Sequence, residues 1–125
     1  MSKLNVEVDI ALRDFVSSIG GEVLGAMLIH WNGFVVSSLA RNGVDAKFLS
    51  AVLAAVKGTV DRMFSKAGIG SANLLLFKAG EYLITMSPIN NDVFLISLAR
   101  EGSNLGLILI GLDHVKERIE KLLNQ

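Results

Sequence analysis

The pattern of apolar residues in the middle of the chain predicts a long helix that buries more than one face. We expect this helix over residues 45–66, with Asp45 as its N-cap. Apolar and small residues recur there in two rows at helical spacing, although a surface helix of a single domain needs only one. The first row is Leu49, Val52, Val56, Val60 and Met63. The second row is Phe48, Ala51, Ala55, Thr59 and Phe64.

Two rows require two partners for this helix. We expect the first row to cover the protein's own sheet and the second row to face another protein chain. A single helix lying in a deep groove of its own domain would also bury two rows, so that alternative stays open.

Each end of the chain has the single apolar row of an ordinary amphipathic helix. The N-terminal row ends before Gly20 and Gly21 and consists of Leu4, Val8, Leu12, Phe15 and Ile19. The C-terminal row follows Ser103 or Asn104 as a possible cap, and consists of Leu105, Ile108, Leu112, Val115, Ile119 and Leu122. The first turn of this last helix is apolar enough to be strand instead.

Short apolar runs bounded by turn residues predict five strands, over residues 23–30, 34–39, 72–78, 82–87 and 93–99. Asn32-Gly33 between the first two runs indicates a type I′ hairpin. The last run is apolar on both alternating faces and therefore belongs in the middle of a sheet covered on both sides. The element order is α-β-β-α-β-β-β-α.

This order predicts an α+β fold, a three-layer α/β/α sandwich on a five-stranded antiparallel sheet. The two terminal helices should cover one face and the middle helix the other. A length of 125 residues suits one domain over residues 1–125.

Composition changes this picture in one respect, because the chain is apolar for its size. Hydrophobic residues make up 51% of it, charged residues 19%, and the mean hydropathy is +0.51. Such a chain favours surface buried in an oligomer. Lys plus Arg and Asp plus Glu number 12 each, so the net charge is zero. Without a clustered basic face, we expect no nucleic-acid binding.

Candidate chemistry is scarce. The chain has no Cys, and His30 and His114 have no carboxylates at ligand spacing, so we expect no metal site. The glycines at 68 and 70 follow a helix and lack the third Gly of a dinucleotide fingerprint, and no P-loop is present. We expect no catalytic or cofactor-binding residue. The charged N-terminus and short apolar runs indicate a cytoplasmic protein without membrane insertion.

Trp31 lies at the tip of the predicted hairpin. A Trp there is either a lid packed on the adjacent sheet or an anchor for a partner, since exposed aromatic residues are enriched in binding hot spots. Packing is the more ordinary role. Trp31 remains a possible partner contact.

Three short motifs, taken with the element order, carry a family resemblance over nearly the whole chain. They are Gly25-Ala26-Met27-Leu28-Ile29, then Asn32-Gly33 followed by Phe34-Val35-Val36-Ser37-Ser38, and Asn104-Leu105-Gly106 before the last helix. In these the chain resembles the roadblock/dynein light-chain domain family. The resemblance implies a roadblock/profilin-like fold.

The resemblance also implies a dimer, formed with a second copy or with a paralogue. In such dimers the third strand, here residues 72–78, pairs with its copy, and the middle helices lie side by side. The sequence agrees, because an apolar strand on a free sheet edge is an aggregation hazard. The expected interface residues are Phe48, Ala51, Val52, Ala55, Thr59, Leu74, Leu75, Leu76 and Phe77.

The function implied by the resemblance is a non-catalytic, homodimeric regulator or scaffold that binds a small Ras-like GTPase and in some relatives stimulates GTP hydrolysis. A bacterial polarity regulator of this kind docks its GTPase on the paired middle helices. Stimulation would act by reshaping the GTPase's own switch loops. The alternatives are a small-molecule sensor domain and a light-chain subunit of a larger motor or signalling complex.

Overall fold

The computed structural model describes residues 3–18, 21–39 and 43–124. Five antiparallel strands form one sheet in the order β2-β1-β5-β4-β3. The strands are β1 (Val23–His30), β2 (Val35–Leu39), β3 (Leu75–Ala79), β4 (Tyr82–Pro88) and β5 (Val93–Arg100). The helices are α1 (Lys3–Ser18), α2 (Ala46–Lys66) and α3 (Leu105–Leu123).

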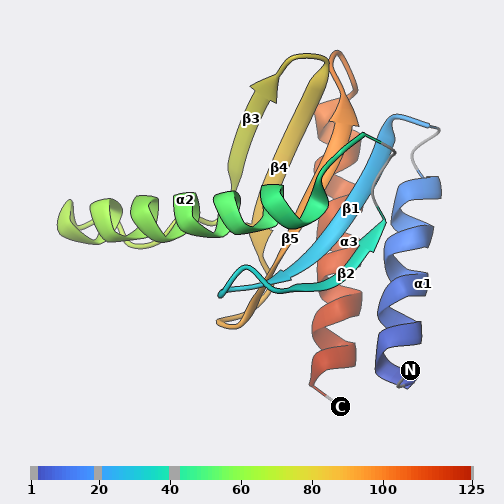
Figure 1. Ribbon diagram of the computed structural model, residues 1–125, viewed down its shortest axis with the longest axis horizontal. Helices are drawn as coiled ribbons and strands as arrows, with labels where there is room; N and C mark the ends of the chain where they lie inside the picture. The colour runs from blue at the N-terminus through green and yellow to red at the C-terminus, as the bar shows by residue number, and fades with distance from the viewer. Residues whose placement is uncertain (1–2, 19–20, 40–42, 125) are drawn as a thin grey trace.

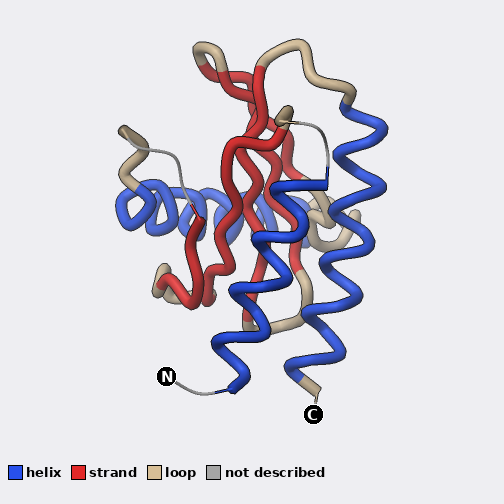
Figure 2. Tube along the Cα trace, turned by 90° about the vertical axis from the view of Figure 1, so that its right-hand side faces the viewer, coloured by secondary structure: helices blue, strands red, loops and turns tan. Residues whose placement is uncertain are grey.

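The helices make the three layers that the sequence predicted. α1 and α3 run side by side over one face of the sheet, and α2 covers the other (Figures 1 and 2). The predicted element order and the predicted burial of β5 on both faces are confirmed, since residues 93–99 are all buried.

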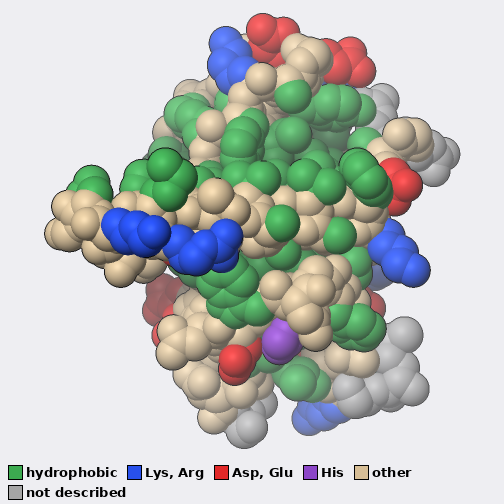
Figure 3. All heavy atoms as spheres, turned by 60° about the vertical axis from the view of Figure 1, so that its left-hand side comes forward, with side chains coloured by type: hydrophobic (Ala, Val, Ile, Leu, Met, Phe, Trp, Pro, Cys, Tyr) green, Lys and Arg blue, Asp and Glu red, His purple; other side chains and the backbone are tan. Residues whose placement is uncertain are grey.

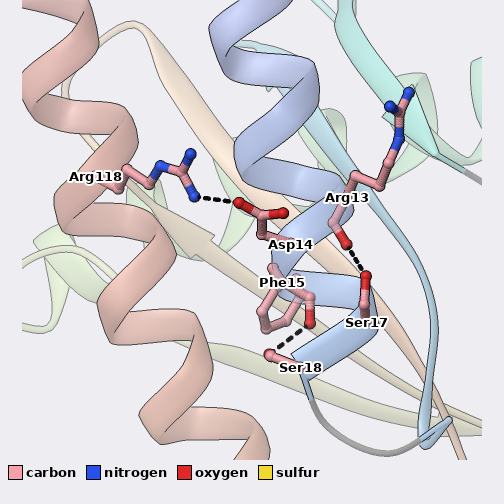
Figure 4. Close-up of polar contacts among 6 residues, drawn as sticks. All are labelled: Arg13, Asp14, Phe15, Ser17, Ser18 and Arg118. Atoms are coloured by element: carbon pink, nitrogen blue, oxygen red, sulfur yellow. Dashed lines mark hydrogen bonds and ion pairs between the residues drawn. The ribbon is translucent and has the colours of Figure 1, made fainter.

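The layer of α1 and α3 packs a continuous apolar core against the sheet. Its buried residues include Leu12, Leu28, Leu95, Ile108, Leu112 and Ile119. At the solvent edge of this layer, Arg118 of α3 donates to Asp14 of α1 over 2.8 Å, while two serines of α1 donate to carbonyl oxygens of their own helix (Figure 4). The predicted row of α1 is correct at Val8, Leu12 and Phe15, although Leu4 is exposed and Ile19 lies outside the described residues.

Two helix starts match their predicted caps. The Asp45 carboxylate accepts the backbone N–H of Phe48 at 3.0 Å, and the Asn104 side chain accepts that of Leu107 at 3.2 Å. The first turn of α3 is therefore helix, which removes the alternative of a strand.

The hairpin between β1 and β2 differs from the prediction. A type I′ turn needs positive φ at both central residues, but among the described residues only glycines have positive φ, here Gly33 at 87°. The Gly33 N–H donates to the His30 carbonyl at 2.8 Å and His30 N–H to the Phe34 carbonyl at 2.8 Å, so the loop has three residues. A Cβ on residue 33 would lie 3.3 Å from the Ala51 Cα, which shows how closely this turn approaches α2.

The prediction for the core-facing row of α2 was wrong. The residues of α2 buried against the sheet are Ser50, Leu53, Ala54 and Lys57. From the predicted row, Leu49 packs partly on this core, but Val52 and Met63 are exposed. Two polar residues face the core because each has a partner: the Ser50 hydroxyl donates to the Ala46 carbonyl at 2.6 Å, and Lys57 pairs with Asp61.

Candidate interaction surface

The projecting half of α2 and the neighbouring edge of the sheet form an exposed apolar surface that no other part of the described chain covers. In Figure 1 the C-terminal half of α2 extends past β3, with no other element beneath it. β3 pairs with β4 along one side, and its other side is an unpaired edge among the described residues. The large apolar residues exposed here are Met63, Phe64, Ile69, Leu74 and Leu76, and Phe48 and Val52 are exposed on the N-terminal half of α2.

Helical spacing divides the surface of α2 into three flanks. The core flank faces the sheet and consists of Ser50, Leu53, Ala54 and Lys57. The Trp31 flank borders the β1–β2 turn and consists of Ala51, Ala55, Gly58, Thr59 and Arg62, which line a hollow together with Trp31. The β3 flank lies on the opposite side of the helix and consists of Val52, Val56, Val60 and Met63.

The figures agree with this division. The β1–β2 turn and β3 lie on opposite sides of α2 in Figure 1. Hydrophobic side chains line one side of the helix and continue over the adjoining strands in Figure 3, whereas Lys and Arg side chains lie along the other side of its projecting half. The apolar surface of the β3 flank is therefore continuous with the free strand edge.

The residues expected at a dimer interface are distributed over two of these flanks. Phe48 is 68% exposed, and Val52, Ala51, Ala55 and Thr59 are exposed as well. Ala51, Ala55 and Thr59 lie on the Trp31 flank, while Val52 lies on the β3 flank. Around β3, Leu74 and Leu76 are exposed and Leu75 and Phe77 are half-buried against the core under α2.

Trp31 packs on its own domain. Its ring meets Phe94 edge-on, with centroids 5.9 Å apart and planes at 70°. Its backbone N–H donates to the Asp92 carbonyl at 3.0 Å. The packing role that the sequence favoured is present, and the part of Trp31 left uncovered forms one wall of the hollow beside α2.

A buried lysine joins three segments at this place. Lys57 is 2% exposed, and its ammonium lies 2.6 Å from the Asp61 carboxylate and 4.9 Å from the centroid of the Trp31 ring. The other oxygen of Asp61 accepts the backbone N–H of Ala72 at 2.8 Å, just before β3. The i, i+4 spacing of Lys57 and Asp61 is the one signal in the sequence that points to this pair.

The pKa of Asp61 is shifted by two opposing influences. Burial alone raises it, but the hydrogen bonds from Lys57 and from the Ala72 backbone, together with the charge of Lys57, outweigh burial and lower the pKa below its usual value. Asp61 is therefore ionised at neutral pH and neutralises Lys57.

The described residues bring together no group of three or more His, Asp or Glu side chains that could hold a metal ion. His30 is half-buried at the end of β1, and His114 is exposed on α3. Over the described ranges, no helix has the length and apolarity needed to cross a bilayer.

Comparison with known proteins gives relatives of low sequence identity. The chain matches no protein-family profile. The uncharacterized proteins MJ1340 and MJ0310 of Methanocaldococcus jannaschii are 27% and 26% identical to it over 100 residues, which cover 80% of this chain and 87% of each relative.

Solved structures resemble it far more closely in fold than in sequence. MglB of Myxococcus xanthus superposes with a TM-score of 0.89 at 14% identity, over 99% of this chain and 92% of MglB. An MglB structure with a tetrameric arrangement gives 0.88 at 13% identity, over 98% and 91%. A Roadblock/LC7 domain from Streptomyces avermitilis gives 0.84 at 14% identity, over 94% and 98%.

The architecture and these superpositions define the class of fold. The chain is an α/β/α sandwich of the roadblock/LC7 type, as the sequence resemblance implied.

Proposed function

We propose that the chain is a cytoplasmic, non-catalytic homodimer that regulates or scaffolds a small Ras-like GTPase. The observation that carries this proposal is that two exposed apolar surfaces adjoin, the unpaired edge of β3 and the β3 flank of α2. An unpaired apolar strand edge invites pairing with another chain unless it is covered. A second copy of the chain would cover both surfaces at once.

In the proposed dimer, β3 pairs with its copy and makes one continuous sheet. The projecting half of each α2 then lies over the sheet of the other protomer, and the two β3 flanks meet. The buried set is proposed to include Val52, Met63, Leu74, Leu75, Leu76 and Phe77. Phe48, Ala51, Ala55 and Thr59, which the sequence also assigned to the interface, share the row of the Trp31 flank and stay on the outer surface of this dimer.

Sedimentation equilibrium tests the dimer with a pair of matched substitutions. Met63→Glu places a charge in the proposed interface and should raise the dimer Kd by roughly 30-fold or more, the size of a hot-spot loss. Ala55→Glu introduces the same charge on the opposite flank and should leave the dimer intact. Dissociation by Ala55→Glu and not by Met63→Glu would show that the other flank faces the partner.

The GTPase partner is supported by the family resemblance that the sequence motifs carry. Its test is calorimetric titration of the dimer with each purified Ras-like GTPase from the same genome, loaded with GDP or with a non-hydrolysable GTP analogue. At least one should bind. Binding by none of them would refute a GTPase regulator.

Hydrolysis rates separate the two forms of the proposal. A regulator that reshapes the GTPase switch loops should raise the single-turnover rate of GTP hydrolysis when the dimer is added. An unchanged rate with retained binding would identify a scaffold instead.

A further inference from the structure

We propose that the hollow between Trp31 and α2, called here the Trp31 groove, binds an acidic segment of a partner protein. This inference rests on the proposed function only in taking a protein as the partner. It assigns a docking site and a charge preference to the Trp31 flank, which the proposed dimer leaves exposed.

The shape of the groove suits one apolar side chain. Its lining residues are Trp31, Asn32, Ala51, Ala54, Ala55, Gly58, Thr59 and Arg62. The floor is made by small residues of α2, and a Cβ on residue 58 would meet only the Arg62 guanidinium, at 3.6 Å. The wall is an aromatic ring. A groove with a low floor and a rigid aromatic wall is a common form of docking site for a partner side chain.

The wall of the groove is fixed in place. The Lys57 ammonium lies 4.9 Å from the Trp31 ring centroid, and Phe94 packs edge-on against the same ring. Burying an ammonium has a desolvation cost, which here is offset by the Asp61 carboxylate at 2.6 Å. The ring is therefore held before a partner arrives, which lowers the entropy lost on binding.

The charges around the groove favour an acidic occupant. Arg62 lines it, and helical spacing puts Lys47 four residues before Ala51 and Lys66 four residues after Arg62. Three exposed cations therefore lie along this flank, against two exposed carboxylates, Asp45 next to Lys47 and Asp92 on the turn that binds the Trp31 N–H. Asp61, which borders this flank, is already paired with Lys57. The chain as a whole is neutral, so this basic flank is a local feature. Three cations are too few for a nucleic-acid site of six to ten phosphate contacts.

Trp31 is the only Trp in the chain, so its fluorescence reports directly on this groove. We would select binders of the dimer from a displayed library of random peptides and titrate them while recording Trp31 emission. The selected peptides should carry Asp or Glu close to Leu, Ile or Phe, and should shift the emission. Peptides without acidic enrichment, or without an effect on the emission, would overturn the proposal.

Three variants test the assignment. Gly58→Leu fills the floor and Arg62→Glu reverses the charge, and each should weaken the selected peptides at least about tenfold, a loss of roughly 1.4 kcal/mol. Lys121→Glu makes the same charge change on α3, where the side chain is 75% exposed, and should change the affinity less than about twofold. Equal losses in Arg62→Glu and Lys121→Glu would refute a site at the groove.

Two further measurements decide between occupants. Arg62→Glu should leave the dimer mass unchanged in sedimentation, and a change would make the groove an interface between copies of this chain. Vesicles containing phosphatidylserine should leave the Trp31 emission unchanged, and a response lost in Arg62→Glu would assign the groove to a lipid surface. The peptide titrations need no GTPase, so they test peptide binding at the Trp31 groove independently of the proposed function.

Discussion

The helices on the two faces of the sheet bury their apolar residues to different degrees. On the face covered by α1 and α3, the core residues Ile108, Leu112, Val115 and Ile119 of α3 are at most 4% exposed. On the other face, α2 buries Leu53 and Ala54, yet its Met63 is 65% exposed. We call these the closed face and the open face.

The lengths of the elements explain the difference. α2 has 21 residues, which at 1.5 Å each span about 32 Å. Five strands about 4.8 Å apart span only about 19 Å from the first axis to the last. α2 lies across the strands and is longer than the sheet is wide. It therefore projects beyond the edge strand β3 (Figure 1). α1 and α3 lie side by side instead and cover their face together (Figure 2).

This difference separates the roles of the two faces. The closed face completes its core within one chain and should supply most of the chain's own stability. The open face leaves apolar surface that only a second molecule can cover. Substitutions on the two faces should therefore differ in how their effects depend on protein concentration.

One of the two largest effects is expected on the closed face. Leu112→Ala removes a side chain that is 2% exposed, in a core that packs α3 on the sheet. It should lower the free energy of unfolding by about 3 kcal/mol, within the usual range for buried Leu to Ala changes. Urea unfolding followed by circular dichroism measures it, and the loss should be similar at all protein concentrations.

Met63→Ala is the matched change on the open face. Because Met63 is 65% exposed, its truncation should change the stability of the single chain by less than about 0.5 kcal/mol. Its effect should instead appear as a weaker dimer, and so as a loss of stability that grows with protein concentration. Equal, concentration-independent losses for both variants would contradict the distinction between the faces.

The other large effect concerns the one buried ion pair that the structure describes. Asp61→Ala leaves the Lys57 ammonium, whose side chain is 3% exposed, without its partner, and should cost about 3 kcal/mol of unfolding free energy. Lys57→Met removes the buried charge itself and leaves Asp61, which is 20% exposed, in reach of water, so it should cost less than about 1 kcal/mol. A larger cost for Lys57→Met would mean that its contact with Trp31 matters more than its pairing.

The pH dependence of stability should report on the same ion pair without removing either side chain. The folded state lowers the pKa of Asp61, so its ionised form stabilises the fold above the unfolded pKa, about 3.9, and this contribution is lost as pH falls through the lower folded value. Asp61→Asn abolishes that contribution. The unfolding free energy of the wild type should therefore fall more steeply than that of the variant as the pH is lowered below about 4. If the unfolding free energies of the wild type and Asp61→Asn fell in parallel as the pH was lowered, the Asp61 charge would have no stabilising role.

The sequence predicted most of the closed face and only part of the open one. Val8, Leu12 and Phe15 and the row from Ile108 to Ile119 were correct because an amphipathic helix with one apolar row has one possible orientation. α2 has apolar residues on several sides, so its pattern allowed more than one rotation. The core side contains Ser50 and Lys57, which look like surface residues until their partners Ala46 and Asp61 are known.

The candidate site shows the same limit. The free edge of β3 and the packing of Trp31 were within reach of the sequence, because apolar runs and a lone Trp at a turn are local signals. The Trp31 groove was not, since it is made by two segments that meet only in the fold. The rotation of α2 decides which residues line it, and in that rotation Lys57 meets Trp31, Asp61 accepts the Ala72 N–H and Ala51 lies close to Gly33.

The smallest effect is expected at the ion pair on the closed face, between Asp14 and Arg118 (Figure 4). These side chains are 61% and 47% exposed, so water and salt screen their attraction, and a double-mutant cycle with Ala should give a coupling energy of about 0.2 to 1 kcal/mol. The coupling should shrink further in 1 M NaCl. A coupling above about 2 kcal/mol would mean that charge, and not apolar packing, holds α1 to α3. The description of the closed face as one held together by its apolar core would then be wrong.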